Sequence, residues 1–209
     1  MIVLKIACVV EGFGDVDALP ILLKRIVKSI DAELMLDASR APIRIPRSKI
    51  EKPQVIEDAV NAAAKQIGGV GGILLLFDAD KDCPKRLAPL LLKKAMEIRS
   101  DLPISVVFAY REYESWFLAA AESLRGKHGL CDTFEAPANI EEKRGAKEWL
   151  KKYMPPGSSY KETIHQPLFT REIDIELARQ NSPSFDKLYR DLQAMTLQLQ
   201  EKQSTLPGN

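Results

Sequence analysis

The chain has 209 residues, with 30 lysines and arginines against 29 aspartates and glutamates, so its formal net charge is +1. The length favours one domain, or one domain with an extension, and 45% hydrophobic and 28% charged residues exclude disorder and collagen-like repeats. No apolar run approaches the roughly 18 residues of a membrane-spanning helix, and the first residues lack the basic leader of a signal peptide. We therefore expect a cytoplasmic protein without a membrane partner, and the thiol of Cys8 inside a predicted core strand fits that compartment.

Strands and amphipathic helices alternate through the first part of the chain. Strands are predicted at residues 2–10, 41–47, 73–77 and 104–109, and helices at residues 15–30, 53–67, 84–98 and 115–124. Most of the strands are continuous apolar runs, typical of strands covered on both faces, whereas prolines at both ends of 41–47 indicate an edge strand or a bulge. Asp82 is a plausible N-cap for the helix that begins at residue 84. The alternation predicts an α/β fold, in which a mostly parallel sheet is flanked by helices.

The pattern changes near residue 125. The remainder is polar and helical, with loops predicted at 155–159 and 181–183. The stretch from 198 to 209 is polar, and we expect it to be frayed. The predicted organisation is therefore an α/β core at residues 1–124 and a helical C-terminal extension at residues 125–209, packed on the core.

Acidic residues follow three of the predicted buried strands. Glu11 follows the first, Asp78 and Asp80 follow the strand at 73–77, and Glu112 and Glu114 follow the last. Because ligands of parallel α/β sheets bind beyond the carboxyl ends of the strands, we expect these acids to converge. Clustered carboxylates repel one another unless a cation neutralises them, and hard oxygen ligands suit Mg²⁺ or Mn²⁺. Each acid taken alone fits a helix cap better than a functional site, but acids at three strand ends together favour a shared metal site.

The spacing within the second group supports a shared ion. Asp78 and Asp80 are two residues apart, so in extended chain their carboxylates point to the same side, and Glu11 from a neighbouring strand completes the set. An EF-hand calcium loop is excluded because it needs glycine at its sixth position and glutamate at its twelfth, where the chain has Cys83 and Pro89.

The last group leaves two alternatives. Glu112 and Glu114 share one side if this stretch stays extended, but only one of them faces the site if a helix begins at Glu112. We favour Glu114, because the buried helix face then begins at Trp116.

The ordered motifs resemble the Toprim fold, the catalytic domain of topoisomerases, primases and OLD-type nucleases. Glu11 matches the glutamate of that family, and Asp78 and Asp80 match its DxD motif. A closer resemblance is to a Toprim-like bacterial family of unknown function, carried by residues 10–12, 77–84, 111–117, 160–166 and 181–185. The resemblance implies that Glu11, Asp78 and Asp80 bind magnesium and that Glu11 also serves as a general acid or base.

Two functions follow from the acids and the resemblance. The first is Mg²⁺-dependent, nuclease-like phosphodiester chemistry on DNA or RNA. Its candidate catalytic residues are Glu11, Asp78, Asp80 and Glu114. Its candidate metal ligands are Glu11, Asp78, Asp80 and Glu112. The second is a non-catalytic module that binds metal or nucleotide and docks a partner in a bacterial defence-type system. That partner would be a separate ATPase, since the chain has no P-loop of its own.

Two segments carry locally concentrated positive charge. Residues 40–52 hold five basic residues against one acidic residue, and residues 143–171 hold seven against two. They are either solvated faces or a phosphate track beside the acids. The candidate nucleic-acid-binding residues are Arg44, Arg47, Lys49, Lys151 and Lys152. In the second segment, His165 is either a proton shuttle or a hydrogen-bonded structural residue.

Overall fold

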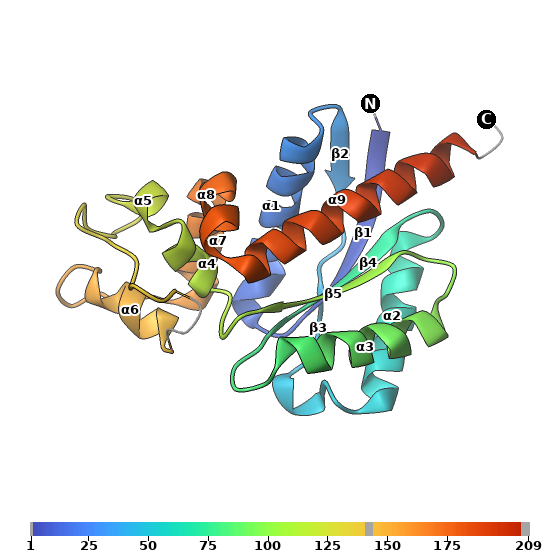
Figure 1. Ribbon diagram of the computed structural model, residues 1–209, viewed down its shortest axis with the longest axis horizontal. Coiled ribbons are helices and arrows are strands. Elements are labelled where there is room, and N and C mark those ends of the chain that lie inside the picture. Colours follow the sequence, from blue (N-terminus) through green and yellow to red (C-terminus); the bar gives the residue numbers. More distant parts are fainter. Residues whose placement is uncertain (1, 141–143, 206–209) are drawn as a thin grey trace.

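A computed structural model describes residues 2–140 and 144–205. It contains a five-stranded parallel sheet flanked by helices (Figure 1), as the alternation of the sequence predicts. The strands are β1 (Ile2–Val10), β2 (Leu34–Asp37), β3 (Ile43–Arg44), β4 (Gly72–Asp78) and β5 (Ile104–Ala109). Their order is β2-β1-β4-β5, and β3 pairs with the last residues of β1.

Nine helices and one 3-10 turn connect and cover these strands in the described part of the chain. They are α1 (Phe13–Ile30), η1 (Arg47–Lys49), α2 (Pro53–Ile67), α3 (Pro84–Ile98), α4 (Ser115–Ala119), α5 (Ala121–Leu124), α6 (Ala146–Lys152), α7 (Glu162–Glu172), α8 (Ile175–Asn181) and α9 (Pro183–Ser204). Helices α4 to α8 lie together at one end of the molecule, away from α2 and α3 (Figure 1). None of the helices in the described ranges is long and apolar enough to cross a bilayer.

The two faces of the sheet carry separate hydrophobic cores. Successive side chains of a strand point to opposite faces, so Ala7 and Val9 of β1 join the core formed with α2 and α3. Cys8 and Val10 join the core formed with α1, α4 and α9. Coverage on both faces explains why β1, β4 and β5 are continuous apolar runs.

The edge of the sheet differs most from the sequence prediction. β2 was not predicted, because its four residues are too few to show a period of their own. The predicted strand at 41–47 contributes only Ile43 and Arg44, since Pro42 and Pro46 on either side have no backbone N–H to extend the ladder.

The structure also corrects the predicted N-cap of α3. The N-cap is Cys83, and Asp82 lies one residue too early to cap the helix. Its carboxylate instead pairs with the guanidinium of Arg47, which joins the β4–α3 loop to η1.

The predicted fraying from residue 198 is wrong for the described part, which ends at residue 205. α9 runs to Ser204 across the sheet (Figure 1), and Leu199 is 1% exposed. Near its end, Gln203 donates a hydrogen bond of 3.0 Å to the carbonyl of Val3, and Lys202 donates one of 2.7 Å to the carbonyl of Asp101. Residues 206–209 of the predicted frayed stretch lie outside the described residues.

Candidate functional site

A polar pocket of about 240 Å³ lies beyond the carboxyl ends of β1 and β4. Parallel strands end at the same edge of a sheet, and the register that sets Val10 beside Leu76 brings the residues after β1 and at the end of β4 together. The acidic side chains that line the pocket are Glu11, Asp15, Asp78, Glu114 and Glu162.

Glu11 follows β1 directly and enters the pocket from the edge of the sheet. Its Oε2 atom is buried and has no hydrogen-bond partner among the described residues. Burial raises the pKa of this carboxyl, Arg47 lowers it, and the negative charge of Asp80 raises it again. The carboxyl therefore carries an unsatisfied oxygen in a place where its ionised form is disfavoured.

Asp78 is the last residue of β4 and lies at the centre of the acidic group. Its Oδ1 atom accepts a 2.9 Å hydrogen bond from the backbone N–H of Tyr113. Burial raises the pKa of Asp78 well above its ordinary value, and the carboxyls of Asp15, Glu114 and Glu11 raise it further. A proton or a cation at this position would relieve that repulsion.

Glu114 resolves the alternative that the sequence left open, because it lines the pocket and Glu112 does not. The side chain is 2% exposed; its Oε1 atom accepts a 3.0 Å hydrogen bond from the hydroxyl of Tyr160 and lies 3.9 Å from Nζ of Lys147. Burial raises the pKa of Glu114 to about 8, although Lys147 and Tyr160 act in the opposite direction.

A hydrogen-bonded pair from α1 and α7 completes the acidic wall and was missed by the sequence analysis. Asp15 is 6% exposed and accepts hydrogen bonds from the backbone N–H of Gly12 at 2.8 Å and from Nε2 of Gln166 at 2.6 Å. Gln166 is 2% exposed. The detectable signal was an acid at the third position of α1, which fits a helix cap as well as a site.

Both basic segments contribute a cation to the pocket. Arg44 and Arg47 come from β3 and η1, and Lys147 comes from α6. Burial alone would lower the pKa of Lys147, but Glu114 and Glu162, with which it forms ion pairs, raise it.

Other predicted site residues lie outside this pocket. Asp80 has a left-handed backbone with φ of 49°, and its side chain is 51% exposed, with Oδ2 4.0 Å from Nε of Arg47. Glu112 is half-buried with an unpartnered Oε2 atom; burial raises the pKa of this carboxyl, and the charge of Lys147 lowers it. The remaining three, Lys49, Lys151 and Lys152, are exposed and do not line the pocket.

His165 also lies outside the pocket lining. Its Nδ1 atom accepts a 2.8 Å hydrogen bond from the backbone N–H of Lys161, and its ring packs near those of Tyr160 and Phe169. These contacts fit the structural alternative for this histidine.

The donor set suits a hard divalent cation. The carboxylates of Glu11 and Asp78 are oxygen ligands, and Glu11 Oε2 has no partner of its own. Within residues 2–140 and 144–205, no three acid, histidine or cysteine side chains are placed to hold one ion together. Mg²⁺ commonly keeps several waters and is bound through one or two carboxylates, so Glu11 and Asp78 are the residues that could hold it.

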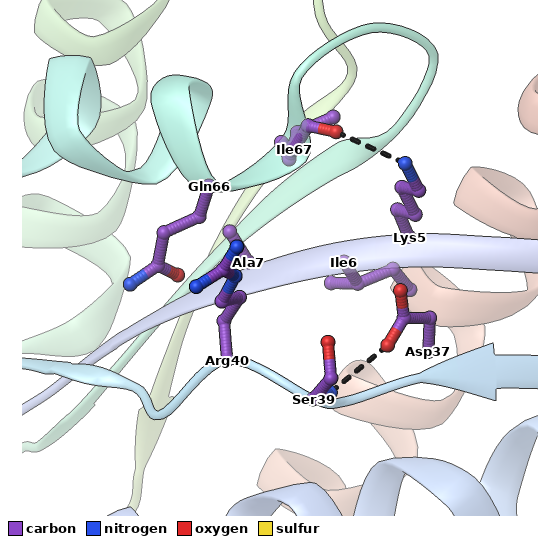
Figure 2. A pocket seen from close by; sticks show the side chains of 8 residues that line it. All are labelled: Lys5, Ile6, Ala7, Asp37, Ser39, Arg40, Gln66 and Ile67. Carbon is purple, nitrogen blue, oxygen red and sulfur yellow. Dashed lines mark hydrogen bonds between the residues drawn. The ribbon is translucent and has the colours of Figure 1, made fainter.

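Arg40 lines a second, smaller pocket of about 140 Å³. This pocket lies beside β1 where β2 ends and before β3 begins, and Figure 2 shows Arg40 and Gln66 directed into it. Lys5 donates a 3.4 Å hydrogen bond to the carbonyl of Ile67 at its border. Thus Arg40, although it belongs to the basic segment 40–52, does not line the acidic pocket.

The comparisons with known proteins give a family. Neither the curated proteins nor the solved structures match the chain. The model of one family, described as a domain of unknown function (DUF4276), matches residues 10–193. This match includes every acid of the pocket, from Glu11 to Glu162. The chain therefore belongs to the DUF4276 family.

Proposed function

We propose that the chain hydrolyses phosphodiester bonds of nucleic acid in a divalent-cation-dependent, nuclease-like reaction. The observation that carries the proposal is the convergence of Glu11, Asp78 and Glu114 from three separate strand ends on one pocket with basic residues in its wall. Three carboxylates held close together at a sheet edge repel one another and so destabilise the folded state, unless a proton or a cation neutralises them. In enzymes of phosphoryl transfer, carboxylates of this kind hold the catalytic metal ions.

In this proposal Glu11 and Asp78 hold Mg²⁺ or Mn²⁺. Both line the pocket, and Glu11 supplies an oxygen without another partner. When bound, such an ion neutralises charge on the phosphate and lowers the pKa of a bound water.

Other side chains of the pocket transfer a proton and bind the phosphate. Glu114 is suited to hold a proton at Oε2 and to give it to the leaving oxygen as the P–O bond to that oxygen breaks. The attacking water forms the new P–O bond and releases its proton to the solvent. Arg44, which lines the same pocket, is placed to bind a phosphate oxygen. DNA and RNA are both candidate substrates, since phosphate recognition does not distinguish them.

The direct test is cleavage of labelled single- and double-stranded DNA and RNA in Mg²⁺ and in Mn²⁺, with and without chelator. We expect cation-dependent cleavage, its loss in Asp78→Asn, and a rate about 100-fold lower in Glu114→Gln. Asp58→Asn is the matched control, because Asp58 is exposed on α2 and contacts Gln54. Absence of cleavage by the wild-type protein on all four substrates would contradict the proposal.

A non-catalytic module that docks a partner, a separate ATPase, is the second candidate. The ion pairs within the pocket favour it, because Lys147 contacts Glu114 and Glu162. These pairs neutralise part of the pocket without any ligand. A protein that cleaves nothing and whose Asp78→Asn variant still binds the same partner would support this alternative.

A further inference from the structure

An exposed aromatic ring lies at the entrance of α1, two residues after Glu11. Phe13 is 64% exposed, although a buried phenylalanine is among the larger sources of hydrophobic stabilisation. The guanidinium carbon of Arg44 lies 3.9 Å from the centroid of this ring. Single exposed apolar side chains are common, but this one is held against a residue that lines the acidic pocket.

Arg44 is fixed in this position by a second contact. Its NH1 group donates a 3.3 Å hydrogen bond to the backbone carbonyl of Glu11. In the part of the chain that the structure describes, Arg44 forms no ion pair, whereas Arg47 pairs with Asp82 and Lys147 pairs with Glu162. Arg44 thus has no carboxylate within ion-pair distance among the described residues, and its guanidinium lies over an aromatic ring.

We propose that the Phe13–Arg44 stack receives an unpaired base of a single-stranded nucleic acid whose adjoining phosphate enters the acidic pocket. This inference rests on the proposed function and narrows its substrate class. The faces of bases in a duplex are covered by their neighbours, so only an unstacked base can lie on the ring or on the guanidinium plane. The exposed part of the Phe13 ring supplies the apolar surface, and Arg44 supplies both stacking and phosphate attraction.

The test compares a fluorescent single-stranded oligonucleotide with the duplex made from it, by anisotropy in Mg²⁺. The protein carries Glu114→Gln throughout, so that the probes are cleaved about 100-fold more slowly and binding is measured before they are degraded. We expect tighter binding of the single strand and a loss of roughly 5- to 150-fold in that affinity with Phe13→Ala, while duplex binding is unchanged. Phe13→Trp should keep the affinity, because a larger ring still stacks.

Two further variants separate stacking from charge and from general effects. Arg44→Lys keeps the charge but removes the plane, so single-strand affinity should fall while its salt dependence stays the same. Leu197→Ala is the matched control, since Leu197 is 56% exposed on α9 and does not line the acidic pocket; its affinity should equal that of the parent.

The outcomes distinguish this inference from the function on which it rests. Cleavage with single-strand affinity unchanged in Phe13→Ala would overturn the inference alone. Single-strand binding that depends on Phe13, without any cleavage by the wild-type protein, would overturn the nuclease proposal alone. Equal affinity for single strand and duplex, or binding of neither, would also overturn the inference.

Discussion

Glu114 and Asp15 are carboxylic acids whose side chains are buried in the folded chain. Glu114 is 2% exposed and Asp15 is 6% exposed, and burial raises the pKa of both. Their hydrogen bonds come from Tyr160, Gly12 and Gln166, so each is partly satisfied when ionised. The folded chain nevertheless binds protons at these positions more tightly than the unfolded chain does, and a change in pH therefore changes stability.

Glu114→Gln tests this property. The pKa of Glu114 is about 8 in the folded chain against an ordinary value of 4.5, so between these pH values the folded state holds the proton that the unfolded state loses. Stability should therefore fall as pH rises through this window, by at most about 1.4 kcal/mol per pH unit for one proton. The glutamine variant should lose this part of the slope and be the more stable protein near pH 8.

Urea denaturation across this pH range measures the effect. The variant keeps the other titratable groups that act on Glu114 or are affected by it, which are Asp78, Lys147, Tyr160 and Glu162. Glu97→Gln is the control, since the side chain of Glu97 is 64% exposed on α3 and should leave the slope unchanged. Identical slopes in the wild-type protein and Glu114→Gln would show that Glu114 does not hold the proton.

At this scale the sequence predicted the acids that follow strands but not the acid that begins a helix. Glu11, Asp78 and Glu114 were found because parallel strands end at one edge. Asp15 was missed because its burial depends on Gln166, which is distant in sequence. Asp80 was expected to share a side with Asp78, but that argument assumes extended backbone, and φ of 49° at Asp80 ends the alternation there.

At the scale of elements, the packing of α7 against α1 builds the wall of the pocket. A Cβ atom added to Gly14 would meet Oε1 of Gln166 and would lie 3.2 Å from Cβ of Glu162. The shortest contact is with the end of the Gln166 side chain, which its hydrogen bond to Asp15 holds in place, so alanine at this position would have to displace that amide. This contact cannot be read from helical periodicity, which fixes a face but not its partner.

Gly14→Ala should therefore destabilise the fold by about 1–3 kcal/mol through overpacking, although alanine is the better helix former. The loss should be smaller when Gln166→Ala is already present, because the clashing amide is then absent. A double-mutant cycle of urea unfolding measures this coupling. Additive effects would mean that Gly14 and Gln166 do not meet.

On the scale of the whole molecule, the predicted core and the predicted extension share one hydrophobic cluster. Trp116 of the first and Phe185 of the second pack edge to face with ring centroids 5.3 Å apart. The strands and major helices of residues 1–124 were predictable from their periods, whereas the path of α9 was not. Its exposed face is polar enough to suggest fraying, and its burial depends on strands far away in sequence.

Two leucines on α9 test whether this helix is part of the core. Leu199 is 1% exposed and Leu197 is 56% exposed, so the pair differs in burial but not in chemistry. Leu199→Ala should lower the free energy of unfolding by about 2–5 kcal/mol, and Leu197→Ala by less than about 0.5 kcal/mol. Thermal or urea unfolding measures both; equal effects would mean that the end of α9 is frayed after all.

In the proposed function, the acidic pocket binds a divalent cation through Glu11 and Asp78. The most direct measurement is thermal unfolding during titration with Mg²⁺ and Mn²⁺, in the wild-type protein, Asp78→Asn and the control Asp58→Asn. We predict that the cation stabilises the wild-type protein and the control, by about 2.7 kcal/mol at a hundred times its dissociation constant. Asp78→Asn should be more stable than the wild-type protein without cation and should show no cation-dependent shift. No shift in the wild-type protein, or the same shift in Asp78→Asn, would contradict the account.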